Sequence, residues 1–292
     1  MSERPLSALV VARNEEQRLA ACLASLTFAD EIVVVLDRCT DASASIAERQ
    51  GARIIAGAWP HEGPRRNTAI SACRSAWVIE VDADERISPA LAAEVRSVVA
   101  ASPFDWHEIP VDNYIGERLV RWGWGGSFGT AAVPRLFRKS AKSWGDQRVH
   151  PRLALRGRQG PRLNNPIEHR VDRNISDMIL RLDRYTSARA SDLRDSGDVG
   201  SLSANVRRLF SRFFKCYVGR KGYREGNWGF LIALCAGLYP LLSYLKATLE
   251  GPSLEQPSLE EANVTAADLR KTELRRDEPT TDNGSGRPAA GS

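Results

Sequence analysis

Hydrophobic residues in the first hundred positions alternate between short continuous runs and wider spacings of three and four residues. Continuous apolar runs are typical of strands buried on both faces, whereas the wider spacing is typical of an amphipathic helix. The runs predict four strands, at Leu6–Ala12, Ile32–Leu36, Arg53–Ala58 and Trp77–Asp82.

Helical patterns lie between and after these runs. One helical face is formed by Leu19, Cys22, Leu23 and Leu26, and another by Leu91, Val95, Val98 and Val99. Asp41 can cap a further helix that continues through Gln50. This alternation predicts an α/β fold with a mostly parallel, Rossmann-like sheet that has helices on both faces.

Polar stretches follow three of the predicted strands, at residues 13–16, 37–41 and 82–85. Ligands of such sheets bind outside the carboxyl ends of the strands, so we expect these stretches to form one site. The sequence contains neither G-x-G-x-x-G nor G-x-x-x-x-G-K, which argues against a dehydrogenase or a P-loop kinase.

The third stretch, VIEVDADERIS at residues 78–88, is strongly acidic. In a strand, Glu80, Asp82 and Asp84 share one face, and carboxylates this close repel each other unless a cation neutralises them. Oxygen ligands of this kind suit Mg²⁺ or Mn²⁺. The alternative is a solvated turn ahead of a helix that Ser88 caps.

The spacing of the cysteines and the first residues of the chain indicate in which cellular compartment the protein is expected. The five cysteines form no C-x-x-C pair, so neither a zinc site nor a disulfide framework is indicated, and a reducing compartment is expected. The first residues, MSERPLSALVVARNEE, lack the apolar run of a secretory signal. We therefore expect a cytoplasmic protein.

A basic amphipathic helix is predicted in the last third of the chain. Its apolar face consists of Val206, Leu209, Phe210, Phe213, Phe214 and Tyr217. Seven basic residues fall within eighteen positions, at Arg207, Arg208, Arg212, Lys215, Arg220, Lys221 and Arg224. The helix could pack on the rest of the protein, or it could lie on an anionic membrane surface.

The apolar run Trp228–Tyr244 favours the membrane alternative. It is shorter than a spanning helix needs and contains Pro240, so it predicts an interfacial or re-entrant hairpin. Beyond Glu250 the chain is rich in polar residues, which predicts a disordered tail. The expected organisation is a sheet domain at 1–200, membrane-associating helices at 201–250 and the tail at 251–292.

Four motifs together resemble the family 2 glycosyltransferases of GT-A fold: ALVVARNEEQRLAACLASL, DEIVVVLDRCTDAS, GPRRNTAI and WVIEVDADERIS. Further stretches are similar to the branch that adds sugars to the lipopolysaccharide inner core: PRLFRK, RVHPRL, IEHR and GYREGNWGFLIA. The resemblance implies a GT-A domain with a helical appendage at its carboxyl end.

The resemblance also implies roles for particular residues. The nucleotide pocket would include Arg13, Asn14 and Glu15, with Asp37 at the base and Arg66 and Asn67 near the nucleotide. Asp82 and Asp84 form the family's D-x-D element, with Asp82 near the ribose or metal and Asp84 on Mg²⁺ or Mn²⁺. Glu80 lies outside that element and is expected to be a polar residue on a partly exposed face.

The general base of an inverting transfer is harder to assign. The branch commonly has V-H-E where this chain has Val149, His150 and Pro151, so the usual acidic residue is missing. His150, Asp146 and Glu168 are the candidates, and a structural role for His150 is an alternative.

The resemblance favours a metal-dependent inverting glycosyltransferase that moves a sugar from a nucleotide-sugar donor to a lipid-linked glycan. It would work on the inner face of the cytoplasmic membrane as a peripheral protein with no nucleic-acid partner. Two alternatives stay open. One is a polyprenyl-phosphate glycosyltransferase, and the other is an inactive module that binds anionic lipid or nucleic acid.

Overall fold

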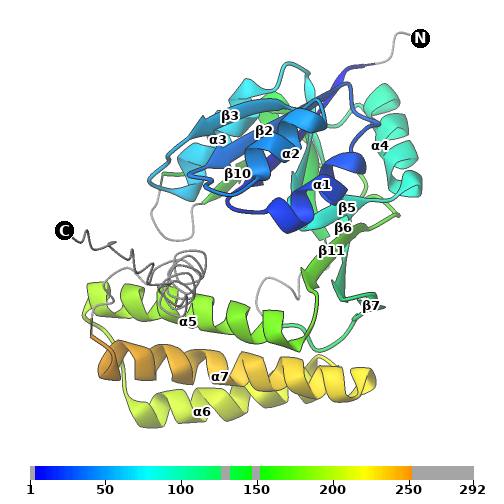
Figure 1. Cartoon of the computed structure of the whole chain (residues 1–292). Helices are drawn as coiled ribbons and strands as arrows, with labels where there is room; N and C mark the ends of the chain where they lie inside the picture. Colours follow the sequence, from blue (N-terminus) through cyan, green and yellow to red (C-terminus); the bar gives the residue numbers. More distant parts are fainter. Residues whose placement is uncertain (1–3, 126–131, 147–151, 252–292) are drawn as a thin grey trace, which may run out of the picture.

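The structure is a computed structural model that describes residues 4–125, 132–146 and 152–251. A sheet unit carries a group of long helices on one side (Figure 1). Its first four strands are parallel: β1 (Leu6–Ala12), β2 (Glu31–Asp37), β3 (Arg53–Gly57) and β4 (Trp77–Asp82). These strands match the predicted ones to within one or two residues at their ends.

The rest of the sheet is mixed. Its strands are β5 (Glu85–Ile87), β6 (Trp106–Ile115), β7 (Arg118–Leu119), β8 (Ala132–Arg138) and β11 (Ile167–Asp172). The order is β3-β2-β1-β4-β8-β6-β11-β5, and β7 pairs with β6. β8 runs antiparallel to both β4 and β6, whereas β11 runs parallel to β6. A separate two-stranded ribbon pairs β9 (Lys142–Trp144) with β10 (Leu153–Leu155).

Helices cover both faces of the parallel strands: α1 (Glu16–Ala24), α2 (Ser43–Arg49), α3 (Glu62–Ala72) and α4 (Pro89–Ala101). Side chains alternate along β1, so Ala8 and Val10 belong to one core cluster and Leu9 belongs to the other. The first cluster includes Leu23 of α1, and the second includes Ile70 of α3. The predicted fold class is therefore confirmed.

Three long helices follow the sheet: α5 (Ile175–Ser196), α6 (Leu202–Phe214) and α7 (Asn227–Leu249). α7 packs between α5 and α6, and α5 is the helix nearest the sheet (Figure 1). A Cβ on Gly237 of α7 would lie 2.7 Å from the Leu209 carbonyl oxygen of α6, so the missing side chain permits this close packing. We call α5, α6 and α7 the helical unit.

The expected hairpin in the apolar run is wrong. α7 is a single helix of 23 residues that continues through Pro240. A proline removes one backbone hydrogen bond from a helix interior, and Pro240 is buried where α7 packs in the helical unit. Among the described residues, α7 is the one helix long and apolar enough to cross a membrane.

Candidate active site

The polar stretches after β1 and β2 are tied together by hydrogen bonds. The backbone N–H of Thr40 donates to the Asn14 side-chain oxygen at 2.9 Å. The backbone N–H of Glu16 donates to Asp41 at 2.9 Å, and the Glu16 carboxylate accepts from the backbone N–H of Ala42 at 3.0 Å. The two loops therefore form one wall at the carboxyl edge of the sheet.

Backbone strain occurs in this same wall. Asn14 and Arg38 have φ values of 54° and 51°, in the left-handed region that residues other than glycine rarely adopt. Arg38 directly follows β2, and Asn14 is the second residue after β1. Such strain clusters at functional sites, where surrounding contacts hold the backbone in place.

The wall also contains Arg13 and Glu15, both predicted to bind nucleotide. Arg13 is exposed, and Glu15 is half-buried. Burial and the charge of Asp84 raise the pKa of Glu15, while Arg18 and Arg184 partly offset this rise. Glu15 therefore lies within electrostatic reach of Asp84, as a shared site requires.

Asp37 lies at the end of β2 with its carboxylate enclosed. Its oxygens accept from Arg38 at 3.0 Å, from Arg65 at 2.9 Å and from the backbone N–H of Trp59 at 3.2 Å. Burial alone would raise the pKa of Asp37, but the Arg38 and Trp59 hydrogen bonds, with the charge of Arg65, hold it below its usual range. Asp37 is therefore a deprotonated carboxylate that these three donors hold in one position at the end of β2.

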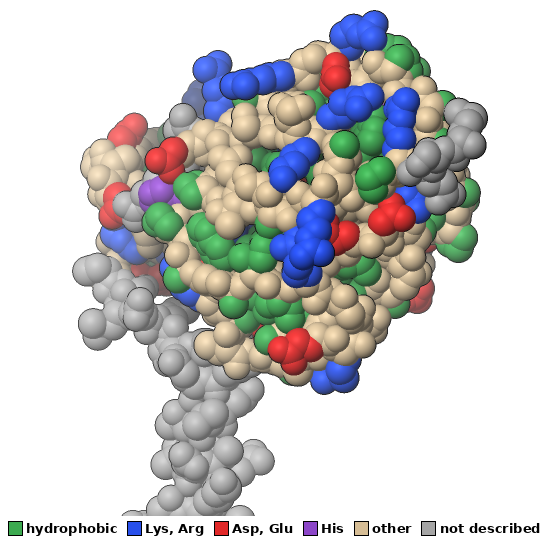
Figure 2. All heavy atoms as spheres, turned by 90° about the horizontal axis from the view of Figure 1, so that it is seen from above, with side chains coloured by type: hydrophobic (Ala, Val, Ile, Leu, Met, Phe, Trp, Pro, Cys, Tyr) green, Lys and Arg blue, Asp and Glu red, His purple; other side chains and the backbone are tan. Residues whose placement is uncertain are grey.

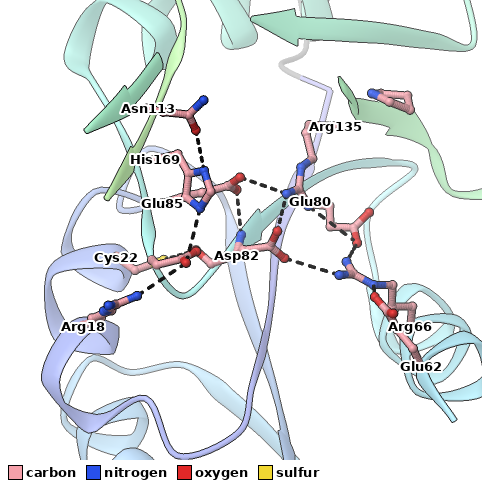
Figure 3. Close-up of polar contacts among 12 residues, drawn as sticks. Arg18, Cys22, Glu62, Arg66, Glu80, Asp82, Glu85, Asn113, Arg135 and His169 are labelled. Atoms are coloured by element: carbon pink, nitrogen blue, oxygen red, sulfur yellow. Dashed lines mark hydrogen bonds and ion pairs between the residues drawn. The ribbon is translucent and has the colours of Figure 1, made fainter. Parts of the chain in front are cut away.

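Asp82 ends β4, where its side chain, about one-third exposed, joins a network of charges (Figure 3). Arg135 of β8 donates to Asp82 and also contacts Glu85 at 2.9 Å. Arg66 of α3 lies 3.6 Å from Asp82. Burial alone would raise the pKa of Asp82, but the two arginines lower it strongly. Asp82 is thus an anion that protein cations already neutralise.

Glu80 belongs to the same network, and its expected partial exposure is wrong. Its side chain is buried, and it accepts from Lys142 and Arg66. Burial would raise the pKa of Glu80, but Lys142, Arg66 and Arg135 lower it to about 2. These partners come from β9, α3 and β8, so Glu80 joins three parts of the sheet unit.

Asp84 has a different environment in the turn after β4. Its side chain is about one-quarter exposed, much as that of Asp82 is, but its basic neighbours differ, and it lies 3.5 Å from Arg18 of α1. The Nε2 atom of His169 on β11 lies 3.3 Å from Asp84, and Nδ1 lies 2.8 Å from the Asn113 side-chain oxygen (Figure 3). Burial alone would lower the pKa of His169, but the hydrogen bond and charge of Asp84 raise it.

A divalent cation fits the Asp84–His169 pair on chemical grounds. With Nδ1 donating to Asn113, Nε2 of a neutral His169 would direct its lone pair to a cation that Asp84 also binds, which is the usual arrangement of a ligating histidine. The described residues contain no preformed group of three or more acidic, histidine or cysteine ligands. Mg²⁺ commonly takes only one or two protein carboxylates and completes its coordination with phosphates and water.

The other predicted residues lie in different settings. The Asn67 side chain makes two hydrogen bonds to the backbone of Trp144, at 2.8 and 2.9 Å. Glu168 pairs with Arg170 at 3.1 Å, and strand alternation directs it to the face opposite His169. Asp146 is exposed just after β9, and His150 lies outside the described residues.

Sequence reasoning did not single out His169 and Arg135, although both lie in quoted motifs, IEHR and PRLFRK. A histidine inside an alternating strand pattern was the available signal for His169. Arg135 had no local signal, because its three acidic partners lie on β4 and β5.

Parts of this chain are similar in sequence to known glycosyltransferases. Residues 7–117 match the model of glycosyl transferase family 2. The lipopolysaccharide core biosynthesis glycosyltransferase LpsC of Rhizobium meliloti is 25% identical over 255 residues, which cover 83% of this chain and 91% of LpsC. An uncharacterized glycosyltransferase of Rickettsia conorii is 33% identical over 97 residues, 33% of this chain and 34% of that protein.

Two solved structures are similar at lower coverage. Staphylococcus aureus TarS in complex with UDP-GlcNAc gives a TM-score of 0.38 and 20% identity, covering 47% of this chain and 46% of that chain. Glucosyl-3-phosphoglycerate synthase of Mycobacterium tuberculosis with Mn²⁺ and UDP gives a TM-score of 0.33 and 19% identity, and the match covers 38% of this chain and 44% of that chain. The matched segment 7–117 contains the strand-end loops and the acidic turn, and the likeness to LpsC extends over most of both chains, so this chain is similar to the family 2 glycosyltransferases and to their lipopolysaccharide core branch.

Proposed function

We propose that this protein is an inverting glycosyltransferase that moves a sugar from a nucleotide-sugar donor to a lipid-linked glycan of the lipopolysaccharide core type. It would act at the cytoplasmic face of the membrane. The observation that carries the proposal is the pairing of partly exposed Asp84 with His169 at the carboxyl edge of the sheet, beside the loops after β1 and β2.

The donor would lie along these loops. Residues 13–15 would line the nucleoside pocket, with Asp37 fixed behind them and Arg66 toward the diphosphate. Asp82, which Arg135 and Arg66 hold in place, would accept a hydrogen bond from the ribose. Asp82 is better suited to this role than to metal binding, because arginines already neutralise its charge.

Asp84 and His169 would hold Mg²⁺ or Mn²⁺. When bound, such a cation stabilises the negative charge that develops on the leaving nucleoside diphosphate. Arg18, 3.5 Å from Asp84, adds a guanidinium that can contact the same oxygens. The acceptor hydroxyl attacks the anomeric carbon, its proton passes to a general base, and the bond from that carbon to the diphosphate oxygen breaks.

His150, Asp146 and Glu168 remain candidates for the general base. The ion pair with Arg170 and the strand alternation make Glu168 less suited, whereas Asp146 is exposed near the end of β9. The likeness to LpsC supports a glycan acceptor over a polyprenyl phosphate.

Calorimetric titration of UDP, GDP and dTDP, with and without Mn²⁺, tests the proposal. We expect one nucleotide to bind in a Mn²⁺-dependent manner, and Asp84→Asn to weaken that binding about tenfold or more. The matched control is Asp192→Asn, which removes a carboxylate on α5 that pairs with Arg189. If no nucleotide binds under either condition, the transferase proposal is wrong.

A further inference from the structure

The outer helix α6 carries a row of exposed apolar side chains. Large hydrophobic side chains exposed to solvent recur at every fourth residue along α6 and the turn after it: Leu202, Val206, Phe210, Phe214 and Val218. Residues four apart lie on the same side of a helix, so this row, the α6 stripe, is a continuous apolar surface. Phe210 and Phe214 are each 57% exposed.

Aromatic side chains extend the α6 stripe toward α7. The ring centroid of Phe213 lies 5.6 Å from that of Phe214, 5.5 Å from that of Tyr217 and 5.5 Å from that of Phe230 on α7. Phe230 is itself about half exposed. The stripe therefore continues into an aromatic cluster that two helices share.

The charged residues of α6 and of the segment directly after it are basic. From Val199 to Arg224 the sequence has seven basic residues and no acidic residue. Arg207 and Lys215 are exposed on α6 and its following turn, and Lys221 and Arg224 are exposed beside Trp122. A partner that fits both the apolar stripe and this charge must be apolar inside and anionic outside, as an anionic bilayer is.

The position of α6 leaves this surface open. α6 lies on the outer side of α7, away from the sheet (Figure 1). Figure 2 views the opposite end of the molecule, where Lys and Arg side chains are spread among neutral and acidic ones. A row of large apolar side chains beside clustered positive charge distinguishes α6 from a merely basic surface.

α7 is less suited to be the membrane contact. It is long enough to span a bilayer, but it packs between α5 and α6 and approaches α6 closely at Gly237. Among its large hydrophobic side chains in the described structure, the exposed ones are Phe230 and Leu249. A spanning α7 would have to lose both neighbouring helices, whereas α6 needs no rearrangement to contact lipid.

We propose that α6 lies flat in the headgroup region of an anionic membrane, with the α6 stripe among the acyl chains and the basic residues at the lipid phosphates. This inference deepens the proposed function, because it names the surface by which the transferase reaches a lipid-linked acceptor. The candidate active site lies on the side of the sheet that faces α5, where Arg173 donates to Gln17 of α1. Docking through α6 therefore turns that edge of the sheet toward the membrane.

Vesicle co-sedimentation of the full chain tests the inference. The probes are vesicles of phosphatidylcholine alone and vesicles that also contain phosphatidylglycerol. The variants are Phe210→Ser with Phe214→Ser on the stripe, Arg207→Gln with Lys215→Gln for charge, and Ile179→Ser with Leu180→Ser as the matched control. The control side chains lie on α5 and are 55% and 52% exposed.

We expect the unaltered chain to bind anionic vesicles more tightly than neutral ones. The phenylalanine variant should lose about tenfold or more in affinity, because two large apolar side chains no longer leave water. The charge variant should lose the preference for anionic vesicles, and the α5 control should bind as the unaltered chain does. High salt should release the bound protein.

Three results would overturn the inference. The first is undiminished binding of the phenylalanine variant. The second is a dimer in light scattering that becomes a monomer in that variant, with vesicle binding by neither protein, since a second copy would then cover the stripe. The third is vesicle association that resists high salt in all variants, as an inserted α7 would give.

Calorimetric nucleotide binding on the same samples separates this inference from the proposed function. If the unaltered chain binds vesicles as expected but binds no nucleotide, the proposed transferase function fails and the docking surface stands. If it binds nucleotide but the phenylalanine variant binds vesicles normally, the docking surface fails and the transferase stands.

Discussion

Arg135 is the basic residue on which the acidic cluster at the end of β4 and in β5 depends most. It lies against Glu80, Asp82 and Glu85, and its side chain is almost fully buried. Burial raises the pKa of Glu85, and Arg135 only partly offsets that rise. Three carboxylates this close together are compatible with the folded state only while the positive charges of Arg135, Arg66 and Lys142 neutralise them.

Arg135→Met should therefore be strongly destabilising. Removing one partner of a buried ion network leaves a charge uncompensated, so we expect a loss of about 3 to 5 kcal/mol in the free energy of unfolding. Urea denaturation measures it. Arg189→Gln, which breaks an exposed pair with Asp192, should cost less than about 1 kcal/mol. Equal effects of the two variants would contradict the role of the network.

Glu80 should make the protein acid-sensitive. Its ordinary pKa of 4.5 falls to about 2 in the folded protein. Between these values the unfolded chain binds a proton that the folded chain does not, so stability present above pH 4.5 is lost as pH falls toward 2. The loss is up to about 3 kcal/mol. Glu80→Gln should flatten the dependence of unfolding free energy on pH in this window, and an unchanged slope would exclude Glu80 as its source.

At the scale of elements, the parallel half of the sheet was predictable and the mixed half was not. β1, β2 and β4 are buried on both faces, so their apolar runs are visible in sequence. β6 alternates and shifts register against both β8 and β11, which removes any continuous run. The acidic residues in the turn after β4 were also evident from the sequence. The partners of Glu80 come from segments distant in the sequence, so its burial had no local signal.

The contact between α6 and α7 gives a prediction at this scale. Gly→Ala in a helix interior ordinarily stabilises by about 1 kcal/mol. At Gly237 the new Cβ would meet the Leu209 carbonyl at 2.7 Å, so we expect Gly237→Ala to destabilise by about 1 to 3 kcal/mol instead. Thermal unfolding measures the change. At Gly219 a new Cβ meets nothing within 4 Å, so Gly219→Ala should not be destabilising. A stabilising Gly237→Ala would mean that α6 and α7 pack less closely.

For the whole molecule, the donor site and the α6 stripe lie on different units and should respond independently. A ligand that binds only the folded state adds about 2.7 kcal/mol of stability at one hundred times its Kd. For a chain of this size that raises the Tm by about 5 °C or more. The preferred nucleoside diphosphate with Mn²⁺ should give this shift in the unaltered chain.

Two variants then separate the sites by differential scanning fluorimetry. Asp84→Asn should lose most of the shift, because the cation and the diphosphate bind through that carboxylate. Phe210→Ser with Phe214→Ser should keep the whole shift, since α6 lies on the far side of α7 from the sheet (Figure 1). If the stripe variant also lost the nucleotide response, α6 would support the donor site directly, and the separation of catalysis from membrane docking would be wrong.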